Sequence, residues 1–114
     1  MPGQVHNTPY LDCCSGPQVA TIKTLSQGNH DCESLCQCQN CGAYWFYRFH
    51  EYVTFMDDDD DWTVWYSRLA PEQARLILEA KDRPDLSFLE NAPGFMKDRS
   101  GVQRVTSQPT DPWM

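Results

Sequence analysis

Hydrophobic and polar positions alternate most clearly in the middle of the chain. Residues 43–55 read AYWFYRFHEYVTF and contain neither Pro nor Gly. Read with a period of two, both faces of this stretch carry aromatic side chains, so the pattern predicts a central strand that is covered on both sides. The polar run MDDDDD follows, and WTVWYSRL (62–69) then resumes a strand pattern. The two runs predict an antiparallel hairpin with the aspartates at its tip.

A helix signal follows this hairpin. Pro71 suits a first helical position, Glu72 lies in the predicted first turn, and Ala74, Ile77 and Leu78 form an apolar stripe. The helix is expected to end before Pro84. Residues 85–91 predict a short helical turn, and residues 18–25 and 101–105 predict two further strands.

This order of elements predicts an α+β domain: a small antiparallel sheet of three to four strands, with one main helix, stapled by a zinc-knuckle site. Residues 10–105 form the predicted domain. Residues 1–9 and 106–114 are polar and rich in Pro, Gly, Ser, Thr and Gln, so we expect a disordered N-terminus and a flexible C-terminal tail. Phe95 and Met96, after the Pro93-Gly94 turn signal, are expected in a loop that covers the sheet.

The cysteines carry the clearest chemistry. Two thiols separated by two residues, as in Cys38-Gln39-Asn40-Cys41-Gly42, can converge on one ion across a tight turn. The glycine that follows permits a positive φ. This stretch resembles the knuckle of zinc ribbons, in which a C-x-x-C-G turn leads into a strand, here AYWF. The resemblance covers about ten residues and implies a local zinc-binding motif.

A structural zinc site takes four ligands, so a second segment must contribute. Cys13 and Cys14 precede the first strand signal and are the natural candidates. Adjacent cysteines tend to point in different directions, so we expect one of them to bind, with Cys36 as a further ligand. The weaker candidates are Cys32 and His30. Structural Zn²⁺ is preferred over reduced buried thiols that act as small apolar residues, and over an iron–sulfur cluster or a redox C-x-x-C.

Catalytic motifs are missing from the sequence. There is no H-E-x-x-H, no deaminase pairing of H-x-E with P-C-x-x-C, and no Gly-rich phosphate loop. A cysteine-rich shell also suppresses the Lewis acidity that catalytic zinc needs. We therefore predict a structural metal and no enzymatic activity.

Charge shapes the expected partners. The formal net charge is −7, which argues against nucleic acid and favours a basic protein partner. The predicted contact surface is the acidic hairpin with its aromatic residues. Its members are Asp57, Asp58, Asp59, Asp60, Asp61, Trp62 and Trp65. In size, acidity and thiol content the chain is similar to some bacterial immunity proteins that block basic toxins, which implies an inhibitor or interaction module.

The alternative function is a nucleic-acid-associated zinc ribbon in a transcription or translation complex, and a third is an uncharacterised enzyme. No apolar run approaches the roughly 20 residues that span a bilayer, so no membrane partner is expected. The first residues lack the features of a secretory signal, so we expect a cytoplasmic protein with reduced cysteines. The sequence leaves the oligomeric state open.

Overall fold

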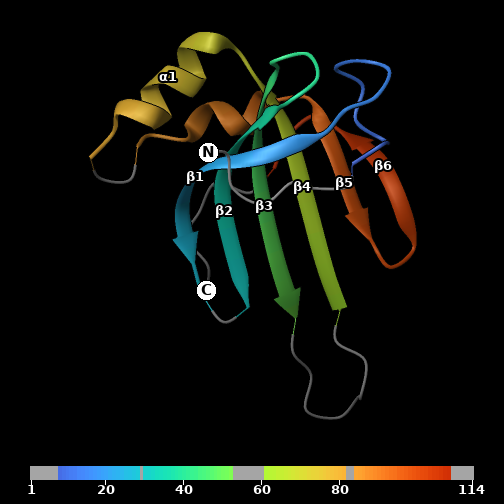
Figure 1. Ribbon diagram of the computed structural model, residues 1–114. Coiled ribbons are helices and arrows are strands. Elements are labelled where there is room, and N and C mark those ends of the chain that lie inside the picture. The colour runs from blue at the N-terminus through green and yellow to red at the C-terminus, as the bar shows by residue number, and fades with distance from the viewer. Residues whose placement is uncertain (1–7, 29, 53–60, 82–83, 109–114) are drawn as a thin grey trace.

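The computed structural model describes residues 8–28, 30–52, 61–81 and 84–108. Within these residues the chain forms a six-stranded antiparallel sheet whose strands lie side by side in sequence order (Figure 1). The strands are β1 (Val19–Gln27), β2 (Asp31–Cys38), β3 (Tyr44–Tyr52), β4 (Asp61–Leu69), β5 (Gly94–Asp98) and β6 (Gly101–Val105). A short helix, α1 (Pro71–Glu79), and a 3-10 turn, η1 (Ser87–Asn91), lie between β4 and β5.

The predicted sheet of three to four strands with one main helix was wrong, because the sheet has six strands and the helix only nine residues. Two strands were missed. β2 lies between the predicted strands at 18–25 and 43–55, where none was expected, and four consecutive residues in it, Glu33 to Cys36, are buried. Its polar and thiol side chains occupy core positions, which hides the apolar alternation that marks most strands. The other predicted strands correspond to β1, β3, β4 and β6, and the helix begins at Pro71 as expected.

β5 was missed because it begins at a residue that signals a turn. Gly94 pairs with Ser67 of β4, and a Cβ added at Gly94 would lie 1.9 Å from the Tyr66 carbonyl oxygen. The glycine therefore permits a close approach of two backbones. Phe95 and Met96, expected in a covering loop, are strand residues that pair with Tyr66 and Trp65.

Each face of the sheet has its own core. On one face, Leu35 and Phe46 pack with residues of α1 and of the η1 region, among them Ile77 and Leu89. On the other face, Trp45, Tyr66 and Phe95 pack with Leu11 from the segment that precedes β1. A sheet buried on both faces agrees with the two-sided aromatic pattern of β3.

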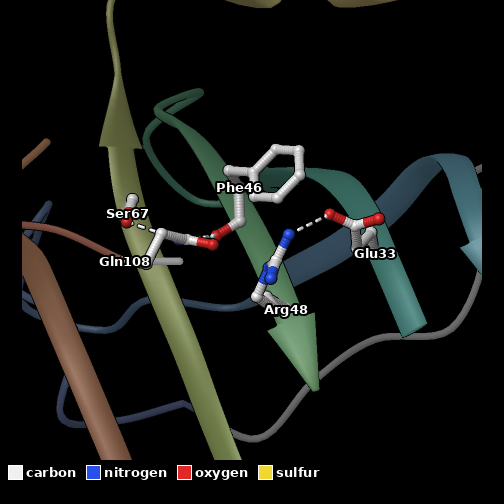
Figure 2. Close-up of polar contacts among 5 residues, drawn as sticks. All are labelled: Glu33, Phe46, Arg48, Ser67 and Gln108. Atoms are coloured by element: carbon white, nitrogen blue, oxygen red, sulfur yellow. Dashed lines mark hydrogen bonds and ion pairs between the residues drawn. The ribbon is translucent and has the colours of Figure 1, made fainter. Parts of the chain in front are cut away.

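Several polar side chains are buried on the face of the sheet that also carries Leu35 and Phe46. Figure 2 shows their polar contacts. The Arg48 Nη2 atom lies 2.6 Å from the Glu33 Oε2 atom, and both side chains are almost fully buried. Farther along this face, the Gln108 amide donates to Ser67 Oγ at 2.5 Å and to the Phe46 carbonyl oxygen at 3.5 Å. Gln108 is buried although it belongs to the predicted tail, and Thr8 of the predicted N-terminal extension is buried too.

Candidate metal centre

The β1–β2 hairpin brings two cysteine segments together. Val19, the first residue of β1, pairs with Cys38, the last residue of β2. Residues that precede β1 therefore lie beside the turn that follows β2. The Gln39 N–H donates to the Gln18 carbonyl oxygen at 2.7 Å and fixes this proximity just beyond the paired ends. The topology thus places the Cys13–Cys14 segment against the Cys38–Cys41 turn.

Four sulfur atoms converge at this point. Those of Cys13, Cys14, Cys38 and Cys41 all lie within 4.8 Å of one another, and the Cys14 and Cys38 sulfurs are 3.9 Å apart. Tetrahedral zinc with Zn–S bonds of about 2.3 Å requires sulfur–sulfur distances of about 3.8 Å. The cluster is therefore close to the size of a tetrathiolate zinc site.

The turn between β2 and β3 has the geometry of a knuckle. Gly42 adopts a φ of 85°, its N–H donates to the Cys38 carbonyl oxygen at 2.9 Å, and the Cys38 N–H donates to the Ala43 carbonyl oxygen at 2.8 Å. A positive φ of this kind favours glycine. The Cys38-x-x-Cys41-Gly42 motif therefore forms the tight turn that its spacing predicts.

The same turn prepares the Cys38 sulfur for metal binding. Burial of this thiol opposes its ionisation. Hydrogen bonds from the backbone groups of Cys41, Gln18 and Asn40 outweigh that cost and lower the pKa of Cys38 to about 6. Because thiolates rather than thiols bind metals, this lowered pKa favours a role for Cys38 as a ligand.

Cys13 has the opposite electrostatic setting. Burial, followed by its contacts with the Cys41 and Cys38 thiols, raises the pKa of Cys13 to about 12, although an interaction with the Trp45 side chain opposes the rise. A bound cation would offset the unfavourable charge and allow this thiolate to form. The cluster therefore combines one thiol that ionises readily with one whose ionisation is opposed by burial.

The donor set fits a soft cation such as Zn²⁺. All four donors are sulfur atoms, which zinc prefers in structural sites. Outside the four ligands, the Asn40 side-chain N–H donates to the Cys14 sulfur at 3.4 Å and to the Gly16 carbonyl oxygen at 3.1 Å. Amide donors of this kind stabilise thiolates and orient them. Four cysteine ligands would leave no open coordination position, which is typical of structural zinc.

The remaining cysteines and His30 lie elsewhere. Cys36 is buried within β2, with its sulfur 3.9 Å from Thr21 Oγ1. The Cys32 sulfur lies 3.6 Å from Ser34 Oγ. His30 is exposed, and its Nδ1 atom lies 3.1 Å from Glu51 Oε1. Among the described residues, the metal-sized cluster contains none of these three side chains. The structure instead brings in both members of the adjacent pair Cys13–Cys14, where one was expected.

Sequence reasoning missed the two residues around the sulfurs. Asn40 lies between Cys38 and Cys41 in the C-x-x-C motif, and this position could have indicated that its side chain lies near the sulfurs. Trp45 was predicted only as a strand aromatic. It is fully buried in the core cluster that includes Cys38 and against which Cys13 and Cys14 pack. No sequence pattern links Trp45 to Cys13, because that contact depends on how the N-terminal segment crosses the sheet.

The proposed partner surface is only partly described. Asp57, Asp58, Asp59 and Asp60 lie outside the described residues, and Asp61 begins β4. Trp62 is half-buried, and Trp65 is only 8% exposed. Arg48 of β3 is buried beside Glu33.

Comparison of this chain with models of known protein families, with curated proteins and with solved structures finds no match. None of the helices in the described part of the chain is both long enough and apolar enough to span a membrane. The metal-sized cysteine cluster is therefore the feature on which a functional proposal can rest.

Proposed function

We propose that this protein is a small β-sheet domain that binds one structural Zn²⁺ through Cys13, Cys14, Cys38 and Cys41, and that it serves as a binding module rather than an enzyme. The convergence of these four sulfurs within 4.8 Å carries the proposal. The ligands come from two segments separated by the β1–β2 hairpin, so the ion would fasten the N-terminal segment to the sheet. Structural zinc of this kind contributes directly to folding stability.

Metal content measured on protein purified under reducing conditions tests the zinc site. We expect one zinc per chain by elemental analysis and native mass spectrometry, and loss of the zinc in C38S/C41S. The matched control is C32S, which removes a half-buried thiol outside the cluster and should retain the metal. A wild-type protein without bound metal that also fails to take up Zn²⁺ or Co²⁺ would contradict the proposal.

We further infer that the binding partner is a basic protein that contacts the acidic hairpin. The support is the net charge of −7 and the run Asp57–Asp61, followed by Trp62. Four zinc-bound thiolates would add about two more negative charges, because Zn²⁺ offsets only half of them. Complementary charge steers association and makes it sensitive to salt. Inhibition of a basic toxin, as immunity proteins perform, is the specific form that this interaction would take.

A defined cationic probe tests the charge of the hairpin. Wild-type protein should bind an oligolysine peptide in low salt and lose that binding as salt rises. Replacing Asp57–Asp61 by Asn should weaken binding at least several-fold. The control replaces Glu72 and Glu79, both exposed on α1, by Gln and should bind more tightly than the hairpin variant. Equal binding by the wild type and the hairpin variant would remove the hairpin from the proposal.

A further inference from the structure

The indole N–H of Trp45 is a buried donor beside the cysteine cluster. Trp45 is 0% exposed and packs in the core cluster against which Cys13 and Cys14 lie. Within the described part of the chain, its Nε1 atom makes no conventional hydrogen bond. Buried donors are normally paired, because an unpaired one loses its hydrogen bonds to water. We therefore expect the indole N–H to find an acceptor when the metal is bound.

The Cys13 sulfur is the candidate acceptor. Cys13 is half-buried and packs against the same core cluster as Trp45. The Trp45 side chain also favours the ionised form of the Cys13 thiol, which lowers its pKa. A neutral thiol is a weak acceptor, whereas a thiolate accepts strong, charge-assisted hydrogen bonds. The Arg68 guanidinium lies 5.6 Å from the centroid of the Trp45 ring. A cation over the ring face withdraws electron density and makes the indole N–H a better donor.

We propose that Trp45 is a positioning residue of the metal centre, whose buried indole N–H donates to the metal-bound thiolate of Cys13 while Asn40 donates to that of Cys14. This inference rests on the proposed zinc site. Trp45 approaches from β3, and Asn40 approaches from the turn between β2 and β3. The two donors orient adjacent cysteines separately, which accounts for the presence of both in one tetrad.

Cobalt substitution of single variants tests each donor. W45F removes the N–H and keeps an aromatic ring; W65F is its control, because Trp65 is also buried but lies outside the cysteine cluster. N40A removes the other donor; Q39A, an exposed neighbour in the same turn, is its control. The measurements are Zn²⁺ affinity by competition with Co²⁺ and the energy of the sulfur-to-cobalt charge-transfer band.

We expect W45F to weaken metal affinity by about 10- to 100-fold, the usual effect of losing an outer-shell partner. Its charge-transfer band should move to lower energy, because a thiolate that loses a hydrogen bond gives up an electron more readily. The charge-transfer band of N40A should shift in the same direction, and the bands and affinities of W65F and Q39A should match those of the wild type. A purely structural role for Trp45 would lower stability without moving the band.

A measurement on the wild-type protein decides the matter if W45F does not fold. The Trp45 indole N–H resonance should move downfield and exchange more slowly with solvent when Zn²⁺ is added. An unchanged resonance, or W45F with wild-type affinity and spectrum, would overturn the role of Trp45 and leave the zinc site intact. Absence of any metal binding by the wild type would overturn both.

Discussion

At the scale of single residues, the Glu33–Arg48 ion pair has the largest predicted effect on stability. The two side chains lie 2.6 Å apart and are 2% and 0% exposed. Replacing one partner of such a pair leaves an uncompensated buried charge, which costs about 3–5 kcal/mol. We therefore expect R48M to reduce the free energy of unfolding by about that amount, as measured by denaturation in urea.

The double variant E33L/R48M provides the matched control. It removes both charges and fills the site with apolar atoms, so it should recover most of the stability lost in R48M. The coupling energy from the full double-mutant cycle then isolates the ion pair. An R48M protein as stable as the wild type would show that the pair contributes nothing to the fold.

At the scale of elements, Lys23 of β1 joins the sheet to the C-terminus of α1. Its Nζ atom donates to the carbonyl oxygens of Ile77 at 2.7 Å and Ala80 at 2.8 Å. A cation at this end of a helix donates hydrogen bonds to carbonyl groups that have no partner within the helix. It also interacts favourably with the negative end of the helix dipole. We expect K23M, which keeps the apolar stem, to lower the free energy of unfolding by about 1–2 kcal/mol.

The control for this prediction is K81M, which removes an exposed lysine just beyond α1. Chemical denaturation of the two variants should show a loss of stability for K23M only. Equal losses would assign the effect to general charge rather than to the helix end. Because α1 is only nine residues long, most of its stability must come from contacts such as this one.

Elements were predictable where local chemistry determines them. Pro71 placed the start of α1, and the aromatic alternation of β3 placed a central strand. Gly42, with its φ of 85°, agrees with the turn expected after Cys38 and Cys41. β2 could not be recognised, because its core positions hold side chains such as Glu33 whose burial depends on a partner in another strand. The inclusion of both Cys13 and Cys14 likewise depends on the long-range pairing of β1 with β2.

At the scale of the whole molecule, the two faces of the sheet differ in what covers them. α1 and η1 cover one face, whereas the N-terminal segment covers part of the other. Besides Leu11, the Tyr10 ring of this segment packs on the rings of Tyr66 and Phe95. A 3.0 Å ion pair joins Asp12 to Arg104, and their side chains are 46% and 72% exposed. Exposed pairs of this kind contribute little. A bound Zn²⁺ would add a link between this segment and the turn after β2.

Removal of zinc should accordingly loosen one side of the molecule and leave the other intact. With free Zn²⁺ about 100-fold above its dissociation constant, binding stabilises the native state by about 2.7 kcal/mol. After chelation under reducing conditions, we expect faster amide hydrogen exchange in residues 8–18 and 38–43. Protection should persist in the core of β3, because the cluster around Phe46 and Ile77 contains no metal ligand.

Mass spectrometry of exchanged peptides provides the measurement, and C38S/C41S provides the control, since its exchange should not respond to Zn²⁺. Loss of protection across the entire sheet on chelation would mean that the metal supports global folding rather than one segment. Unchanged exchange in residues 8–18 would mean that the N-terminal segment does not depend on the ion. The expected local response follows from the position of the cluster, which joins the segment before β1 to the turn after β2.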